Sequence, residues 1–140
     1  MSWIYKGVVF TPEMIPEGAV GFIYEMTAII DGKSVAYIGK KNFALVTKKK
    51  LAKKNAPVDK RKKNYVKTSK LNYENYFSSN VVLKQVHKDN IPIKRNILHI
   101  CYSKTELTYM ETKYQFVKGV LESDYYLNGN ILGRFYKQKY

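Results

Sequence analysis

Residues 21–40 constrain the fold more than any other stretch. Two runs rich in β-branched and aromatic residues flank an Asp31-Gly32 pair, which can supply the two positive φ angles of a type I′ turn. The sequence therefore predicts a β-hairpin over this range, in which Ile30 pairs with Lys33.

This register has a consequence for two tyrosines. Tyr37 lies opposite Met26 and diagonal to Tyr24, so both phenols belong to one sheet face and are expected to face outward together. Tyrosine is common in strands, so half-buried packing is the simpler interpretation of the pairing alone. Gly39, two residues after Tyr37, is expected to let the backbone approach a phosphate closely.

Two further elements follow later in the chain. Apolar positions within 81–88 fit a short helix capped by Ser78 or Ser79. Residues 93–102 alternate imperfectly and predict a third strand beside the hairpin. His87, near the end of the short helix, is interpreted as a surface residue that complements the helix dipole.

The segment from Ser103 to Glu106 forms a capping box, which predicts a helix beginning at about Lys104. Glu111 falls at the edge of its apolar face, where a lone carboxylate is costly unless a positive charge meets it. The apolar positions predicted to pack on the sheet are Leu107, Met110, Tyr114, Val117 and Leu121. We therefore predict an α+β fold with a three-stranded antiparallel sheet flanked by helices.

Positive charge is concentrated in one part of the chain. The net charge is +14 over 140 residues, and residues 40–70 carry +12 of it. A concentration of positive charge of this size favours a polyanionic partner, although a basic segment that is merely solvated is the simpler alternative. We interpret residues 46–68 as a loop or arm, part of it a possible short helix, that orders on nucleic acid. The candidate nucleic-acid ligands are Lys48, Lys49, Lys50, Lys53, Lys54, Lys60, Arg61, Lys62, Lys63 and, from the turn-rich C-terminal region, Arg134.

The length and composition predict one domain over 1–140, with 1–20 as an extension that covers a sheet edge or face. Cys101 is the single cysteine, so no intramolecular disulfide is expected, and no Cys/His cluster has zinc-ligand spacing. No apolar run is long enough to span a membrane, and no signal peptide is recognisable. We therefore expect a cytoplasmic protein.

Several blocks together resemble the GIY-YIG nuclease family, and most closely its small freestanding phage members of the Seg-like homing endonuclease type. The blocks are 3–10, 21–24 (GFIY), 37–41 (YIGKK), 73–79 and 103–125. The resemblance implies a nuclease that cleaves DNA, in the host cytoplasm if the gene is carried by a phage.

Roles for individual residues follow from the same resemblance. Glu111 matches the family's metal ligand, for which Mg²⁺ or Mn²⁺ is the expected ion. Tyr24 matches the tyrosine implicated in activating the attacking water, and Tyr37 the one that orients that water or the scissile phosphate. The late asparagine of the family corresponds to Asn128 by spacing from Glu111, or to Asn130 by the Asn-Ile pairing.

One family feature is missing. The family has an arginine about eight residues after the second tripeptide, where this chain has Thr47 and Lys48. Lys40, Lys41 or Lys48 can supply charge there, but not the bidentate fork of arginine.

We therefore expect a divalent-metal-dependent endonuclease that acts on double-stranded DNA as a monomer or transient dimer, with Lys40 and Lys41 in its site. No residues remain for a separate recognition domain, so long-site specificity is not expected. The alternatives are a non-catalytic nucleic-acid-binding module on the same scaffold, and a structural or inhibitory protein acting on a nucleic-acid machine.

Overall fold

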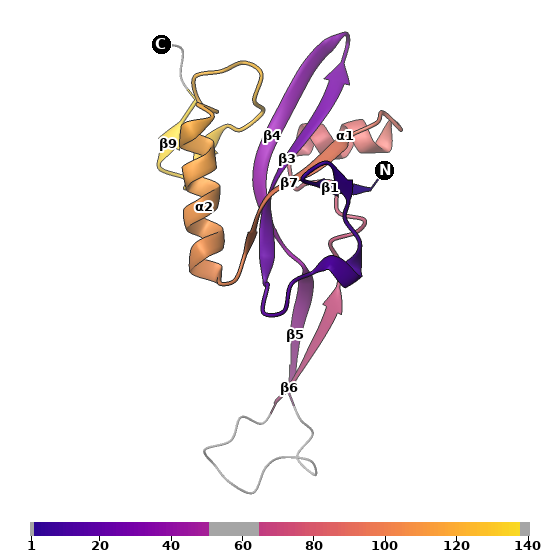
Figure 1. Ribbon diagram of the computed structural model, residues 1–140. Helices are drawn as coiled ribbons and strands as arrows, with labels where there is room; N and C mark the ends of the chain where they lie inside the picture. The colour runs from indigo at the N-terminus through magenta and orange to yellow at the C-terminus, as the bar shows by residue number, and fades with distance from the viewer. Residues whose placement is uncertain (1, 51–64, 138–140) are drawn as a thin grey trace, which may run out of the picture.

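The computed structural model of the chain describes residues 2–50 and 65–137, with the backbone alone described at 47–50 and 65–68. Figure 1 shows a central sheet with one helix on each side and a narrow ribbon that extends from one end. The elements are β1 (Trp3–Tyr5), β2 (Val8–Val9), a 3-10 turn (Pro12–Met14), β3 (Gly21–Ile30), β4 (Lys33–Asn42), β5 (Ala44–Lys50), β6 (Tyr65–Leu71), α1 (Val81–Lys88), β7 (Lys94–Cys101), α2 (Lys104–Val117), β8 (Asn130–Ile131) and β9 (Phe135–Tyr136).

The predicted hairpin is confirmed. β3 and β4 pair antiparallel with Ile30 opposite Lys33, and the turn residues Asp31 and Gly32 have φ angles of 51° and 76°. A ten-residue ladder of this kind forms because its turn, its β-branched residues and its alternation all favour the same register.

The sheet has more strands than predicted and is mixed. Its order is β2-β1-β7-β3-β4, and β7 is the expected third strand, antiparallel to β3. The three-stranded antiparallel prediction was wrong because β1 adds parallel to β7, and β2 then pairs with β1 through a turn at Lys6 and Gly7. The N-terminal residues thus extend the sheet edge as strands. A short parallel pairing of this kind is a long-range contact that local patterns do not reveal.

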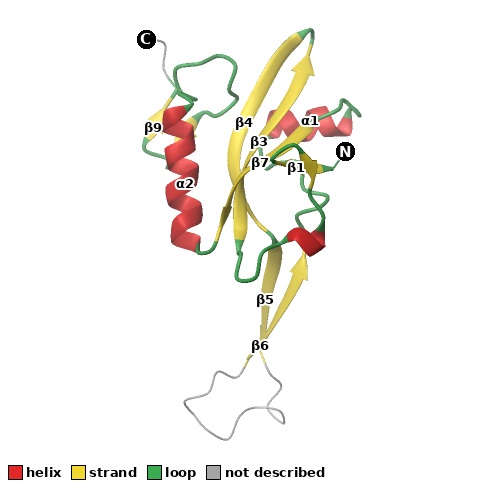
Figure 2. Cartoon of the chain, in the orientation of Figure 1, coloured by secondary structure: helices red, strands yellow, loops and turns green. Residues whose placement is uncertain are grey.

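Both faces of the sheet are covered, as Figure 2 shows with its two helices on opposite sides. Alternation along β3 sends Phe22, Tyr24 and Met26 to an aromatic-rich face that also receives α1. Ile23, with Ile38 of β4, contributes to the opposite face, where α2 and the C-terminal residues pack. Residues 21–24 are consequently all buried.

The first helix, α1, spans the predicted residues but has a different cap. α1 is capped by Asn80, whose Oδ1 accepts hydrogen bonds from the N–H groups of Val82 and Leu83, so neither Ser78 nor Ser79 is the cap. Ser78 instead turns the chain with a φ of 77°. Neither described helix has the length and apolar character needed to cross a membrane.

α2 begins as predicted, with Ser103 Oγ accepting from the Glu106 N–H at 3.0 Å. Its apolar stripe is shorter than predicted. Val117 is 72% exposed, and Leu121 is buried only after the helix has ended, because Gly119 turns the chain with a φ of 60°.

The basic segment is partly a β-ribbon. β5 and β6 pair antiparallel from Ala44 opposite Leu71 to Lys50 opposite Tyr65, and Figure 1 shows the pair extending away from the sheet. The expectation of a loop or short helix was therefore wrong at residues 46–50 and 65–68, where Val, Thr and Tyr are interspersed with lysine and favour strands. Lys53, Lys54, Lys60, Arg61, Lys62 and Lys63 lie outside the described residues.

Candidate active site

Tyr24 and Tyr37 lie diagonally on one face of the hairpin, as the register predicts, with ring centroids 6.3 Å apart. They do not face outward together. Tyr24 is only 1% exposed, whereas Tyr37 is partly exposed. The Tyr24 ring lies over Gly39, where an added Cβ would come within 2.5 Å of the phenol oxygen. Gly39 therefore makes room for Tyr24; a close approach of its backbone to a phosphate stays a prediction.

Three hydroxyl groups from the loop before α1 join the two tyrosines. Tyr24 Oη lies 3.3 Å from Tyr76 Oη and 3.4 Å from Ser78 Oγ, and Ser79 hydrogen-bonds to Tyr37. We call these five residues the hydroxyl cluster. Sequence analysis gave no role to its loop members; the resemblance over 73–79 was the one signal that pointed to them.

Arg95 of β7 holds this loop against the sheet. Its Nη1 donates to the carbonyl oxygens of Glu74 at 2.7 Å and Tyr76 at 2.9 Å. The guanidinium lies 4.8 Å from the Trp3 ring centroid and 4.1 Å from that of Phe77. Burial lowers the pKa of Arg95 to about 10, so it remains charged at neutral pH. The charged Arg95 side chain thus holds the carbonyl groups of Glu74 and Tyr76, and with them the loop that carries the Tyr76 hydroxyl.

β4 is the last strand of the sheet, and its outer edge is paired by residues from the C-terminal third of the chain. Asn128 accepts from the Ile38 N–H at 3.0 Å and donates to the Ile38 carbonyl at 2.8 Å. Gln115 of α2 donates to the same carbonyl at 3.1 Å. The Ala36 N–H donates to the Tyr125 carbonyl, two residues earlier along the edge.

Glu111 continues this edge by one step. Its carboxylate accepts a hydrogen bond from the Lys40 backbone N–H. We call Glu111, Gln115 and Asn128 the β4 edge group. Asn128 is thus placed against the hairpin, whereas Asn130 lies in β8 and accepts from the Gly133 N–H.

Electrostatics tie the hydroxyl cluster to the edge group. Burial raises the pKa of Glu111, and the nearby Lys40 charge and N–H partly oppose that rise. The pKa of Tyr37 is raised by burial and then by the negative charge of Glu111, so the two side chains interact across the edge of β4. Burial also raises the pKa of Tyr24 far above its usual value.

Lys40 and Lys41 alternate to opposite faces of β4. Lys40 Nζ donates to Thr108 Oγ1 at 3.1 Å, on the α2 side. Lys41 Nζ donates to Asn72 Oδ1 at 2.7 Å and lies 5.3 Å from the Tyr76 ring centroid, and burial lowers its pKa. A pocket of about 400 Å³ opens beside them; it is lined by Lys40, Lys41, Asn42, Lys104, Leu107 and Thr108.

The remaining predicted ligands lie elsewhere. Lys48, Lys49 and Lys50 belong to β5 of the ribbon. Arg134 is exposed in the β8–β9 hairpin, which contacts α2 through Phe135 and Phe116. His87, left out of the site, stacks on Phe77 with ring centroids 3.9 Å apart.

Comparison with known proteins gives one match. A family model described as "Putative endonuclease segE, GIY-YIG domain" matches residues 3–131. This range includes the whole hydroxyl cluster and the whole β4 edge group. The chain belongs to the GIY-YIG family. No curated protein and no solved structure matches it.

Membership confirms the Seg-like GIY-YIG resemblance. Within this GIY-YIG domain, Tyr24, Tyr37 and Glu111 come from β3, β4 and α2, which pack together at the end of the sheet where β4 is the last strand. Among the described residues, Lys40 and Lys41 of β4 and Lys104 of α2 line the pocket at this end of β4. The arginine that contacts the hydroxyl cluster, Arg95, comes from β7 and bonds loop carbonyls instead.

Proposed function

We propose that this chain is a divalent-metal-dependent endonuclease that hydrolyses phosphodiester bonds in double-stranded DNA. The observation that carries the proposal is the place of Glu111, whose charge acts on Tyr37 across the edge of β4 while its carboxylate bonds the Lys40 N–H. The proposal joins this carboxylate with Tyr24 and Tyr37 of the aromatic face and with Lys40 and Lys41 of β4.

The donor set suits Mg²⁺ or Mn²⁺. Glu111 offers carboxylate oxygen, which hard divalent cations prefer, and such ions retain several waters and take substrate phosphate as a further ligand. Burial raises the pKa of this carboxyl, so its charged form gains from a cation beside it. When bound there, the ion would supply charge stabilisation at the phosphate.

The tyrosines differ in what they can do. Deprotonating Tyr24 in place is unfavourable, because burial and Tyr76 raise its pKa. We assign Tyr24 the task of orienting the attacking water through its hydroxyl and through Tyr76. Tyr37, which is partly exposed and borders Glu111, orients the scissile phosphate. Burial lowers the pKa of Lys41 toward neutral pH, which is the direction that favours a proton acceptor.

DNA binding rests on two basic surfaces. The lysine-lined pocket beside Lys40 and Lys41 takes the phosphate next to the site. We assign the DNA-backbone contacts to the β5–β6 ribbon, because its two strands include Lys48, Lys49, Lys50 and Lys67. A two-stranded ribbon also has the width that a major groove admits.

A non-catalytic DNA-binding module is the second candidate. The replacement of the family arginine by Thr47 and Lys48 favours it, because lysine cannot bond a phosphate through a bidentate fork. The two candidates share the basic surfaces and differ only at the β4 edge.

Plasmid cleavage tests the proposal. Supercoiled DNA should be nicked or linearised with Mg²⁺ or Mn²⁺, and EDTA should stop the reaction. Salt-dependent binding without cleavage in any divalent ion would favour the second candidate, and equal cleavage in EDTA would exclude the metal.

A triple replacement tests the ribbon. Lys48, Lys49 and Lys50 changed together to Gln should lower the slope of log K against log salt by up to about 0.9 for each lost phosphate contact. Affinity should fall equally for all sequences, since phosphate contacts carry no base information. The matched control removes three exposed lysines elsewhere, and should keep the slope; these are Lys84, Lys88 and Lys118. Equal loss in both variants would contradict a role for the ribbon.

A further inference from the structure

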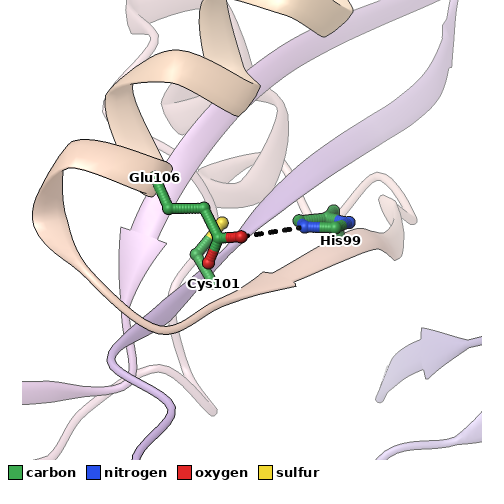
Figure 3. A group of neighbouring side chains, drawn as sticks. All are labelled: His99, Cys101 and Glu106. Atoms are coloured by element: carbon green, nitrogen blue, oxygen red, sulfur yellow. Dashed lines mark ion pairs between the residues drawn. The ribbon is translucent and has the colours of Figure 1, made fainter.

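A second group of metal-binding side chains lies at the N-terminal end of α2, away from the β4 edge group. His99 and Cys101 are two residues apart in β7, and Glu106 lies in the first turn of α2. The ligand atoms of the three all lie within 4.8 Å of one another. Figure 3 shows the carboxylate between the imidazole and the thiol.

The three side chains differ in exposure. Cys101 is fully buried, and its sulfur is directed into the group. His99 and Glu106 are 36% and 35% exposed, and the Nε2 and Oε2 atoms are 3.6 Å apart. Glu106 Oε1 also accepts from the Tyr102 N–H at 2.6 Å, which fixes the carboxylate. The group therefore has a buried sulfur ligand at its base and an opening toward solvent.

We propose that His99, Cys101 and Glu106 bind one Zn²⁺ ion, with water from the open side as the fourth ligand. Imidazole nitrogen, thiolate sulfur and carboxylate oxygen are the donors that Zn²⁺ takes, and the sulfur disfavours Mg²⁺. Metal-ligand bonds of about 2.0 to 2.3 Å place tetrahedral ligands about 3.3 to 3.8 Å apart. The 3.6 Å separation of His99 and Glu106 already falls in this range.

Binding replaces a proton. The Cys101 thiol is fully buried and must lose its proton to bind zinc. On binding, the S–H bond breaks, its proton passes to solvent, and the sulfur lone pair forms the bond to zinc. No oxidation or reduction occurs. The thiolate and the carboxylate together neutralise the two charges of the ion.

The position gives the ion a structural role. Cys101 pairs with Gly21 at the start of β3, and Glu106 belongs to the helix that carries Glu111 about one and a half turns later. Zinc at this point joins the end of β7 to the first turn of α2. The spacing of Cys and His in the sequence predicts no zinc site, because the third ligand is a glutamate in the next element.

Cobalt and zinc titrations of the full chain, after treatment with a chelator, test the proposal. Co²⁺ should give a sulfur-to-cobalt charge-transfer band that saturates at one ion per chain and can come only from Cys101, because the chain has one cysteine. Zn²⁺ should displace the cobalt and raise the midpoint of thermal unfolding.

The variants separate ligation from folding. Cys101→Ala should abolish the band, and His99→Gln and Glu106→Gln should each weaken binding at least tenfold. Glu106→Gln keeps an oxygen that accepts from the Tyr102 N–H, and His99 is partly exposed, so both should fold without metal. The matched controls are His87→Gln, which removes the other histidine, and Glu111→Gln, which removes the proposed nuclease ligand; both should bind zinc as the wild type does.

Two results would overturn the proposal: no saturable sulfur-to-cobalt band in the wild type, or a band whose Co²⁺ affinity is unchanged by both His99→Gln and Glu106→Gln. Neither result depends on cleavage of DNA. A protein that binds zinc at Cys101 and does not cut DNA would support this site and refute the proposed nuclease, and the reverse outcome would do the opposite.

Discussion

The hydroxyl cluster and the β4 edge group meet at Tyr37 but are built in different ways. The cluster is a set of neutral hydroxyls held by packing on the aromatic face, where Tyr24 lies over Gly39 and Arg95 anchors the loop. The edge group consists of polar side chains that pair the free backbone groups of β4. Under the proposed function, catalysis and stability would depend on different side chains of the edge group: Glu111 carries the charge, and Asn128 pairs the backbone of Ile38.

The largest effect is expected from Glu111→Gln. Glutamine keeps an oxygen for the Lys40 N–H but loses the charge that would hold a divalent ion. Cleavage of plasmid DNA should fall by about 100- to 1000-fold, with DNA affinity nearly unchanged. Glu122→Gln, at an exposed position after α2, is the matched control and should cut normally. If Glu111→Gln cleaved DNA at the wild-type rate, Glu111 would have only a structural role, which is to pair the edge of β4.

Tyr24→Phe comes next in size. It keeps the ring over Gly39 and removes only the hydroxyl that lies near Tyr76 and Ser78. We expect cleavage to fall by about 100-fold, as for loss of a group that positions the attacking water, with an unfolding free energy within about 1 kcal/mol of wild type. Single-turnover cleavage and urea denaturation measure the two effects. A large loss of stability with unchanged cleavage would show that the hydroxyl cluster stabilises the fold and takes no part in cleavage.

Asn128→Ala should show the opposite pattern. It leaves the Ile38 N–H without its acceptor at a buried position, which costs about 1–3 kcal/mol of unfolding free energy. Asn130→Ala is the control, because Asn130 is exposed and its side chain bonds within its own turn. Urea denaturation of both variants compares them directly. If the two variants had equal unfolding free energies, the hydrogen bonds of Asn128 to Ile38 would not be needed to stabilise the edge of β4.

The smallest effect is a pH dependence at Glu111. Its pKa is raised in the folded state, so the folded chain binds more protons than the unfolded chain between the ordinary carboxyl pKa and the raised value. The unfolding free energy of the wild type, relative to Glu111→Gln, should therefore fall as pH rises through that window and level off above it. Urea denaturation in EDTA at several pH values measures this difference. A difference that does not change with pH would mean that the carboxyl is as well solvated as in the unfolded chain.

Local sequence predicted the hairpin and the start of α2 well, because the Asp31-Gly32 turn fixes a register and Ser103 fixes a helix start. It did not predict the burial of Tyr24, since alternation gives a face but not what covers that face. The covering loop is held by Arg95, which lies 21 residues after Glu74 and 19 after Tyr76. Arg95 donates to backbone carbonyl groups, which every residue type has. The identities of the residues at the acceptor positions therefore do not predict these hydrogen bonds.

The basic segment and the N-terminal strands were missed for different reasons. At residues 46–50 and 65–68, the high density of lysine led to the prediction of a loop, although Val, Thr and Tyr there favour the strands that form. β1 is a short strand, and its parallel partner β7 lies about ninety positions later, so no local pattern reports the pairing. The position of Glu111 was predictable as a helix edge, but its bond to the Lys40 N–H depends on how α2 docks.

The pairing of the β4 edge has a further consequence for self-association. An exposed edge strand is a template onto which another chain can add a strand, and folded proteins commonly cover such edges. Here the backbone groups of Ala36 and Ile38 are already bonded by Tyr125, Leu127 and Asn128. The same strand edge that borders the proposed catalytic carboxylate is therefore closed to edge-to-edge joining of two copies of the protein.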